Sequence, residues 1–466
     1  MVVAALVLSI SHVASVAVMY LGLRRAFHAP ILIAAGFATM LAAGVGYHYI
    51  NSEFSAPFYG LFALLTWYVG QLCILYGVTW KRALWFAVLG LITGLIRPDG
   101  VIFAALMLCG TMYGVRENRG TLLVSFVAIF GVLGGIYFAW RLHYFGYPLP
   151  IPFYAKHESS LNWSNAKVSA RNIISMLLPL LPLAGLGLIN KKLTRLLIAW
   201  LIAIIPFTLV WMVISLDNNH FSRFQYVMVP MSILTLGGLL SESWRQVSED
   251  YPRQIESLKK PLVAAVGMLF ACAIIYNLRL YDIPYSNVGA VELADRLRPY
   301  ASKNYTMVVT EAGDLPLRSE WKAIDTFGFN DAFIARNKGL LTEEYLDRYQ
   351  PEIIMYRVMA SFHTVGELQS QVLGVPPPAG TDNNLTLNDV VMHAYAKKHN
   401  YVLAAVWGGQ YCDYHVFWVR SGMRDSDAIV SAIRDHPYYM QLTGQLSYDF
   451  RGAAVPTVPC NLNARS

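Results

Sequence analysis

The sequence predicts a polytopic α-helical membrane protein, with about ten transmembrane segments, that carries an α/β domain at its C-terminal end. Hydrophobic residues make up 56% of the 466 residues and charged residues only 14%, a balance too apolar for an ordinary soluble protein. Ten apolar runs, most of them near the length that crosses ~30 Å of hydrocarbon, follow one another up to residue 278. Shorter, alternating patterns replace them from residue 279 onward.

The apolar runs are expected to form helices that span or enter the membrane. They lie near residues 2–21, 30–48, 57–79, 83–96, 101–115, 121–140, 172–190, 195–215, 225–241 and 261–278. The fourth and fifth runs are short, and only Arg97-Pro98-Asp99-Gly100 separates them. They form either two thin helices or one broken re-entrant pair, which a membrane tolerates where the broken backbone faces protein or water.

The loops between the runs alternate in charge. Lys and Arg gather in one set of loops, at Arg24-Arg25, Lys81-Arg82, Arg116 with Arg119, Lys191-Lys192 with Arg195, and in residues 242–260. If all ten runs span the membrane, every basic loop falls on one side, which is the positive-inside pattern. The net charge of +7 is therefore interpreted as membrane topology, with no nucleic acid among the expected partners. The same topology places residues 279–466 outside the cytoplasm.

Residues 279–466 are expected to form an extracytoplasmic α/β domain, and residues 1–278 the transmembrane domain. Short apolar strands are predicted at residues 306–310 and 352–356, and helical patterns at residues 290–297 and 342–349. Residues 375–380 read Val-Pro-Pro-Pro-Ala-Gly, which predicts a loop.

The cysteine pattern does not predict a metal site. The five cysteines include no Cys-x-x-Cys pair, so a structural zinc site is not expected. Cys412 and Cys460 fall in the part assigned to the outside of the cell. They are candidates for a disulfide with each other, because disulfides persist in oxidising compartments.

Unusual polar residues near the apolar runs collect on the predicted outer side, where charge close to lipid is costly and asks for an explanation. Arg97 and Asp99 could bind a lipid headgroup, or could form an ion pair that closes a helix hairpin. Asp217 and His220 could perform acid-base chemistry with Arg223 on a phosphate, or could belong to a solvated turn.

The stretch RLHYFGYPLPIPFYAKH at residues 141–157 combines cations, aromatic rings and prolines. Arg141, His143 and Lys156 could donate to an anionic phosphate, while rings such as Tyr144 and Tyr154 could stack on an isoprenoid or a sugar. An interfacial aromatic belt with snorkelling cations explains the same composition. The residues alone leave both interpretations open.

Taken in order, these motifs resemble the type C (GT-C) membrane glycosyltransferases, and most of all the bacterial branch that contains the terminal arabinofuranosyltransferases. The resemblance rests on Arg97-Pro98-Asp99-Gly100, on the run from Arg141 to Lys156, and on Arg223-Phe224 followed by Pro230. In the outer domain it rests on residues 311–314 and 324–336, where Asp314, Asp325, Asn330 and Asp331 match the branch's signature.

The resemblance implies transfer of a sugar from a polyprenyl-phosphate donor to an envelope glycan or glycolipid, with inversion, at the outer face of the bacterial plasma membrane. Lys156 and Arg141 would hold the phosphate, with Arg97, His143, Tyr144, Tyr154, His220 and Arg223 completing the phosphate and lipid site. The donor carries its own leaving group, so no nucleotide cofactor is implied, and a divalent cation is left open.

One feature departs from the family pattern. The family's catalytic base is an acidic residue in the first outer loop, and no such loop precedes the apolar run at residues 2–21. That run resembles the family's second span, and the loop charges place Met1 outside the cytoplasm. We therefore expect a chain that lacks an N-terminal span and loop, or a variant that uses Asp99 or Asp217 as its base.

Two other functions use the same features. A transporter or flippase of lipid-linked saccharide needs a basic and aromatic cavity but no base, and internal repeats, which favour such transporters, are not evident in this sequence. A catalytically incomplete membrane protein whose outer domain binds glycan is the third reading. A glycosyltransferase of the cell envelope is the leading hypothesis.

Overall fold

The computed structural model describes most of the chain as two compact units. The described residues are 2–44, 46–51, 55–157, 160–189, 191–216, 219, 222–250, 261, 264, 267–268, 270–272, 274–275, 290–337, 339–359, 384–408, 413–435 and 439–440. Residues 1–149 and 156–284 form the helical unit, and residues 150–155 and 285–466 form the sheet unit. The predicted loop at 375–380 lies outside the described residues, as do Asp217, His220, Cys412 and Cys460.

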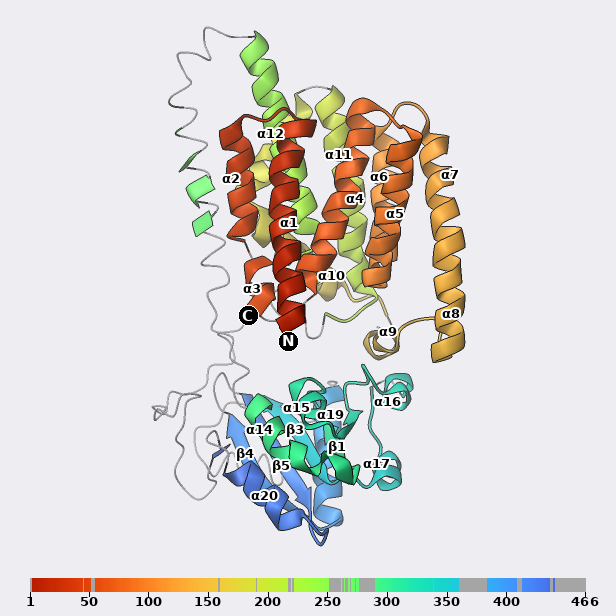
Figure 1. The fold of residues 1–466 in the computed structure, drawn as a ribbon, viewed down its shortest axis with the longest axis vertical. Coiled ribbons are helices and arrows are strands. Elements are labelled where there is room, and N and C mark those ends of the chain that lie inside the picture. Colours follow the sequence, from red (N-terminus) through yellow and green to blue (C-terminus); the bar gives the residue numbers. More distant parts are fainter. Residues whose placement is uncertain are drawn as a thin grey trace. The chain divides into compact units, whose positions relative to one another are not determined.

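The helical unit consists of helices and their connecting segments (Figure 1). The elements up to residue 250 are α1 (Val2–Ala26), α2 (Ile31–Ala42), α3 (Gly46–Asn51), α4 (Ala56–Tyr76), α5 (Trp80–Ile96), α6 (Asp99–Gly114), α7 (Arg119–Ile129), the π-helix η1 (Phe130–Gly134), α8 (Gly135–Phe145), α9 (Ile151–Lys156), α10 (Trp163–Leu177), the 3₁₀-helices η2 (Leu178–Leu188) and η3 (Val210–Met212), α11 (Lys191–Leu209) and α12 (Met228–Asp250). Of these, α9 up to Ala155 belongs to the sheet unit. The fourth and fifth apolar runs form two separate helices, α5 and α6.

Five described helical segments are long and apolar enough to cross a membrane. They are Val3–Ala26, Ala56–Tyr76, Arg119–Phe145, Trp163–Leu188 and Lys191–Met212. Ile31–Ala42 and Asp99–Gly114 are shorter apolar helices. A membrane-embedded helical protein is therefore supported, whereas the predicted number of ten spans stays a prediction.

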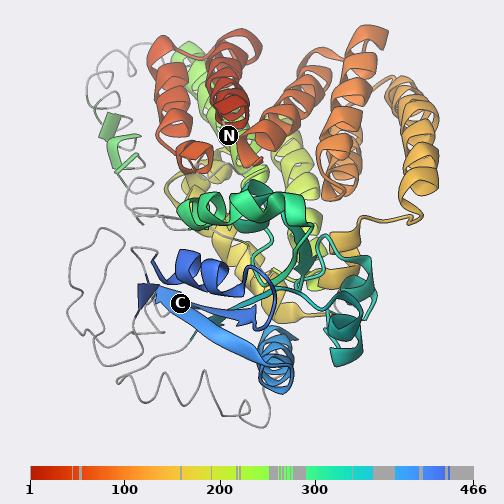
Figure 2. The ribbon, with the colours of Figure 1, turned by 60° about the horizontal axis from the view of Figure 1, so that its bottom comes forward.

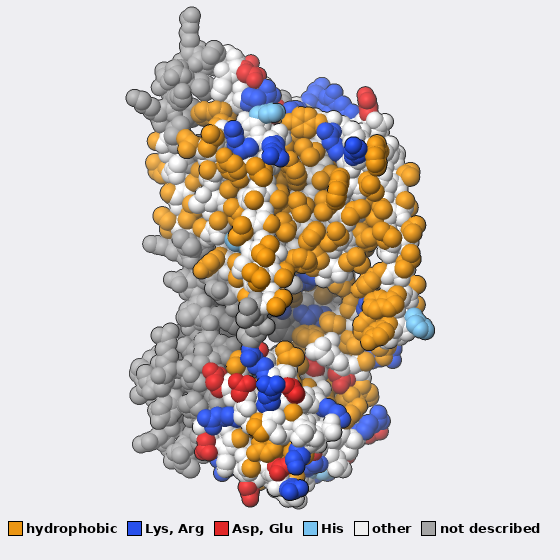
Figure 3. Space-filling model, viewed as in Figure 1, with side chains coloured by type: hydrophobic (Ala, Val, Ile, Leu, Met, Phe, Trp, Pro, Cys, Tyr) orange, Lys and Arg blue, Asp and Glu red, His pale blue; other side chains and the backbone are white. Residues whose placement is uncertain are grey.

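The surface of the helical unit is also that of a membrane protein. Figure 3 shows hydrophobic side chains over most of its visible face, with Lys and Arg side chains gathered at one end. Arg24 and Arg25 lie in the last turn of α1, and Lys191 and Lys192 begin α11. Helices α7 and α8 lie at the margin of this unit (Figures 1 and 2), and only Leu122 and Phe126 are buried along α7, η1 and α8.

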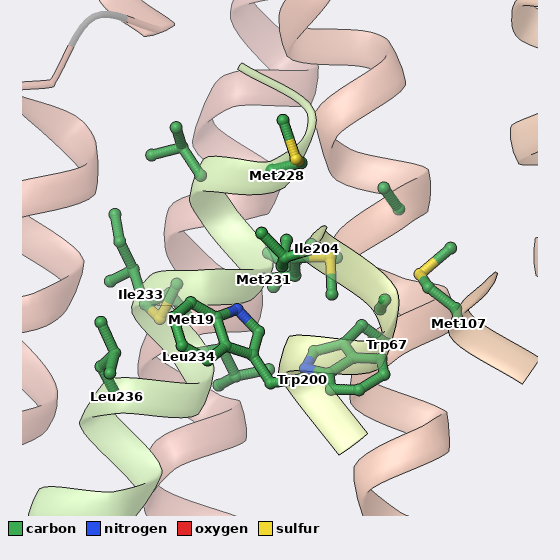
Figure 4. Packing of buried hydrophobic residues seen from close by; sticks show 14 of the residues in the cluster. Met19, Trp67, Met107, Trp200, Ile204, Met228, Met231, Ile233, Leu234 and Leu236 are labelled. Carbon is green, nitrogen blue, oxygen red and sulfur yellow. The ribbon is translucent and has the colours of Figure 1, made fainter. Parts of the chain in front are cut away.

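Buried polar pairs connect the central helices through the apolar core. The indole N–H of Trp67 on α4 donates to Thr235 Oγ1 on α12 at 2.8 Å, and that of Trp200 on α11 donates to Ser232 Oγ at 2.9 Å. Figure 4 shows both tryptophans among Met and Ile side chains of this core. Each hydrogen bond satisfies a buried donor and fixes how two helices face each other.

A glycine lets α6 and α11 approach closely. A Cβ atom built on Gly110 would lie 2.2 Å from the backbone oxygen of Ala199, which is far shorter than any real contact. A larger residue would therefore force the two helices apart, as expected where small residues allow membrane helices to pack backbone to backbone.

The sheet unit contains one six-stranded mixed sheet with the strand order β2-β1-β3-β5-β4-β6. Its strands are β1 (Thr306–Val309), β2 (Lys322–Asp325), β3 (Ile353–Met359), β4 (Tyr401–Gly408), β5 (Asp413–Arg420) and β6 (Tyr439–Met440). Strand β1 pairs in parallel with β2 and β3, and the remaining pairs are antiparallel. The α/β fold and the strands predicted near residues 306 and 353 are therefore found.

Helices cover the sheet and complete two apolar layers (Figures 1 and 2). They are α14 (Ala290–Leu297), the 3₁₀-helix η5 (Arg298–Lys303), α15 (Asp314–Ser319), α16 (Ala332–Arg336), α17 (Glu343–Tyr349), α19 (Asn384–Lys398) and α20 (Ser426–Arg434). Val308, Ile354 and Trp418 pack with α19 residues on one face, whereas Met307 and Phe417 pack with α14 and α20 residues on the other. This alternation follows the two-residue period of β-strands.

Candidate functional site

Phe224 is the centre of the candidate site, and a hydrogen-bonded turn places it. Asn219 Oδ1 accepts from the backbone N–H of Phe224 at 3.0 Å, and Asn219 Nδ2 donates to Gln225 Oε1 at 2.7 Å. Gln225 in turn donates to Ser169 Oγ on α10 at 3.2 Å. The Phe224 ring stacks on Trp211, with centroids 5.0 Å apart and planes 6° apart. The turn and the stack together hold the ring just before α12.

Three cationic side chains converge on the Phe224 ring. The charged groups of Arg97, Lys156 and Arg223 lie 5.0, 4.8 and 5.2 Å from its centroid. Each distance is within the range of a cation–π contact. These residues are far apart in the sequence, so the fold gathers charges that the sequence predicted in three separate motifs. Arg97, Lys156, Arg223 and Phe224, with Asp99, are called the cation cluster below.

Asp99 is the acidic residue of the cation cluster, and it pairs with Arg97. Arg97 ends α5 in an extended conformation, and Asp99 lies in the first turn of α6, where the helix dipole favours a negative charge. Arg97 Nε donates to Asp99 Oδ1 at 2.9 Å, and the Arg97 guanidinium also lies 5.5 Å from the Tyr59 ring centroid. The pair that the sequence offered as a hairpin closure is therefore formed, within reach of the other cations.

The backbone around Lys156 is fixed to the segment that follows Trp211. The backbone N–H of Ser215 donates to the Lys156 carbonyl at 2.8 Å, and His157 forms an antiparallel bridge with Ile214. Nearby, the backbone N–H of Asn162 donates to the Met212 carbonyl at 2.8 Å. These bonds attach Lys156, His157 and Asn162 to residues 212–215, which follow α11, and so help to bring Lys156 to Phe224.

One buried polar atom at this site, the indole nitrogen of Trp211, has no hydrogen-bond partner among the described residues. Trp211 is 3% exposed. Tyr59, which is 1% exposed, places its hydroxyl next to the Asp99 carboxylate, within reach of a hydrogen bond. An unsatisfied buried donor or acceptor costs about 1–3 kcal/mol. A buried donor without a partner, beside three cations, therefore asks for an explanation, and a polar ligand would supply one.

Four other residues predicted for the phosphate and lipid site, Arg141, His143, Tyr144 and Tyr154, make contacts within their own segments. Arg141 Nη1 donates to the Pro148 carbonyl at 2.8 Å, so it stabilises the turn that follows α8. His143 and Tyr144 are exposed on α8, and Tyr144 stacks on Trp140. Tyr154 packs edge-to-face on Phe153. The role of these four residues in the site stays a prediction.

In the sheet unit, the residues of the predicted motif organise a loop. The Asp325 carboxylate accepts from the backbone N–H groups of Phe327, Phe329 and Asn330, each at 3.0 Å, and from Asn330 Nδ2 at 3.3 Å. Burial raises the pKa of Asp325, and the three N–H donors oppose that shift. The Asp325 carboxylate thus holds the loop after β2 by accepting hydrogen bonds from its backbone N–H groups.

The two remaining aspartates of that motif also have structural partners. Asp331 Oδ1 caps α16 by accepting from the N–H groups of Phe333 and Ile334, and its Oδ2 accepts from the Tyr345 hydroxyl at 2.8 Å. Asp314 pairs with Arg318 one turn along α15 at 3.1 Å. These contacts explain the motif by loop and helix structure without requiring a ligand.

The described residues contain no group of three or more His, Cys, Asp or Glu side chains placed to hold a metal ion. Cys73, Cys109 and Cys272 are free thiols. The proposed disulfide between Cys412 and Cys460 concerns residues outside the described part of the chain, so it remains a prediction.

Tyr59 and Trp211 were not among the residues predicted for the site. Both lie in apolar runs where an aromatic residue is ordinary, and the sequence does not reveal that Tyr59 lies beside Asp99 or that the Trp211 N–H lacks a partner among the described residues. A weak signal is that each lies near the predicted outer end of its run, where the other motifs collect.

Comparison with protein families gives one match. A family model described as a domain of unknown function (DUF8728) matches residues 277–426, which fall mainly in the sheet unit and make up less than half of the chain. A comparison with curated proteins gives no match.

Proposed function

We propose that this protein is a membrane glycosyltransferase that moves a sugar from a polyprenyl-phosphate donor to an acceptor of the cell envelope. The observation that carries the proposal is the convergence of Arg97, Lys156 and Arg223 on Phe224, within 5.2 Å of one ring centroid. Cations in a partly dehydrated site favour a phosphate far more than they do in water. The resemblance of the same three motifs to the GT-C enzymes supports a lipid-linked donor.

In the proposed reaction, the anomeric carbon of the sugar exchanges its bond to the donor phosphate for a bond to an acceptor hydroxyl. The phosphate leaves with the bonding electron pair, and the cation cluster stabilises the charge that it gains. A base takes the proton of the acceptor hydroxyl. Asp99 suits this role because Arg97 holds one carboxylate oxygen and the carboxylate lies next to the cations that would bind the phosphate.

The proposed location is the bacterial plasma membrane, with the cation cluster and the sheet unit on the outer side. Support comes from basic residues at the other end of the helices from the cation cluster, namely Arg24, Arg25, Lys191 and Lys192. Arg24 and Arg25 end α1, and the other two begin α11, whose far end leads to Trp211. The positive-inside rule then assigns the basic ends to the cytoplasm.

A transfer assay tests the proposal. Membranes that contain the full chain are supplied with a radiolabelled polyprenyl-phosphate sugar and envelope glycan as acceptor. We expect the wild type to transfer label and Lys156→Ala to transfer it at least about tenfold more slowly. Lys167→Ala removes an exposed cation on α10 and should transfer label at the wild-type rate.

The same assay separates the rival functions. Label that crosses the membrane on its original lipid, without a new glycosidic bond, would identify a flippase. If the wild type transfers label and Lys156→Ala transfers it equally well, the cation cluster is not the donor site.

A further inference from the structure

Trp211 differs from every other buried tryptophan among the described residues. The indole N–H groups of Trp67, Trp200, Trp321 and Trp418 donate to Thr235, Ser232, the Leu297 carbonyl and the Tyr356 hydroxyl, at distances between 2.8 and 3.2 Å. The Trp211 N–H is equally buried and has no partner among the described residues. Buried tryptophans usually pair this donor, so the exception calls for an acceptor that the described residues do not supply.

The surroundings of Trp211 indicate which kind of acceptor is missing. Its ring lies parallel to Phe224 at 5.0 Å, and the same Phe224 ring is approached by Arg97, Lys156 and Arg223. A donor next to three cations favours an anionic oxygen over a neutral one, since the three cations outnumber the one carboxylate, Asp99, in the cluster. A phosphate oxygen is the acceptor that suits both the donor and the cations.

We propose that the indole N–H of Trp211 donates a hydrogen bond to a non-bridging oxygen of the lipid-borne phosphate. The inference rests on the proposed function and adds a positioning residue to it. The stack on Phe224 fixes the plane of the indole, so the direction of its N–H is fixed and the hydrogen bond orients the phosphate. The cations attract the phosphate electrostatically but do not fix its orientation. Neither the charge pattern of the sequence nor the family match assigns this role to Trp211.

The test compares Trp211→Phe with Trp200→Phe and Trp67→Phe. All three variants lose the same ring volume and one N–H, but only the last two also lose a hydrogen bond between helices (Figure 4). Purified full-length protein is melted with and without a short-chain polyprenyl phosphate that carries no sugar. The melting temperature without ligand reports structure, and the titrated ligand-induced shift reports affinity.

Of the three variants, we expect Trp211→Phe to lower the melting temperature least. Its affinity for the lipid phosphate should fall at least about tenfold, as expected for the loss of a charge-assisted hydrogen bond. Trp200→Phe and Trp67→Phe should melt earlier and keep wild-type affinity. A benzothiophene ring at position 211 keeps the size of the indole without its N–H, and it should weaken binding like Trp211→Phe.

The outcomes distinguish this inference from the proposed function. If the wild type binds the lipid phosphate and both replacements at position 211 bind it equally well, Trp211 is not a phosphate ligand although the site stands. If the benzothiophene variant alone binds normally, ring volume rather than the N–H matters, and the inference is wrong. If the wild type fails to bind, the proposed function falls, and this inference with it.

Discussion

At the scale of single residues, the site combines charges that the sequence reveals with polar atoms that it hides. Arg97, Lys156 and Arg223 stand out in the sequence because a cation beside an apolar run is costly. Tyr59 and Trp211 do not stand out, since their importance comes from the folded structure: Tyr59 lies beside Asp99, and the Trp211 N–H has no partner among the described residues. The sequence also favoured Arg141, whose guanidinium donates to the Pro148 carbonyl and whose role in the site stays a prediction.

Asp99→Asn tests the acid-base role at this scale. The amide keeps the size of the carboxylate and an oxygen for Arg97, but it does not accept a proton at neutral pH. Turnover should fall about 100-fold or more, while affinity for the lipid phosphate stays equal or rises because a negative charge leaves its neighbourhood.

The measurement for Asp99→Asn is a steady-state rate with labelled donor, together with a binding titration of polyprenyl phosphate. Glu117→Gln makes the same chemical change at an exposed position and should leave both quantities at wild-type values. A variant Asp99→Asn with full turnover would exclude Asp99 as the base.

At the scale of elements, the apolar runs predicted where helices lie, but not where an α-helix changes to a 3₁₀-helix. The run at residues 172–190 was expected to be one helix. Instead, α10 ends at Leu177 and the 3₁₀-helix η2 follows to Leu188, because Pro179 and Pro182 lack the N–H that an α-helix needs. The prolines were visible in the sequence, but the apolar run concealed their effect.

Gly110→Ala tests the close packing of α6 on α11. The added methyl group would meet the Ala199 carbonyl at 2.2 Å, so the helices must separate, at an expected cost of about 1–3 kcal/mol for overpacking. Gly120→Ala on α7 meets nothing within 4 Å and should be neutral or slightly stabilising, since alanine favours helix.

Thermal melting of the two glycine variants in the same detergent gives the comparison. Equal melting temperatures for Gly110→Ala and Gly120→Ala would mean that the α6 and α11 backbones are not in contact.

At the scale of the whole molecule, the sequence predicted a membrane-embedded helical part followed by an α/β part, and the structure contains both kinds of unit. The strand order β2-β1-β3-β5-β4-β6 could not be predicted, because pairing between β3 and β5 joins residues that are distant in the sequence. The cation cluster was beyond sequence reasoning for the same reason, since Arg97, Lys156 and Arg223 meet only after the helices have packed.

The pH dependence of stability should show the influence of Asp389 on α19. Burial raises the pKa of Asp389 well above its ordinary value of 3.8, and its Oδ1 atom has no hydrogen-bond partner among the described residues. A raised pKa means that the folded state favours the protonated acid. The resulting stability is fully present below the ordinary pKa and is lost as the pH rises through the raised value.

Asp389→Asn should therefore melt at a higher temperature than the wild type at pH 8, and the difference should vanish near pH 4. Asp295→Asn, at an exposed position on α14, should follow the wild type at both values. A wild type that melts higher than Asp389→Asn at pH 8 would show that the charged form of Asp389 stabilises the fold.

The central claim is that Arg97, Lys156 and Arg223 around Phe224 receive a lipid-borne phosphate. The most direct measurement compares the affinity of the purified full-length protein for a short-chain polyprenyl phosphate and for the matching polyprenol, which has the same lipid without the charge. We expect the phosphate to bind at least tenfold more tightly, about 1.4 kcal/mol, and Lys156→Ala to lose most of that preference. Equal affinity of the wild type for the phosphate and the alcohol would contradict the claim.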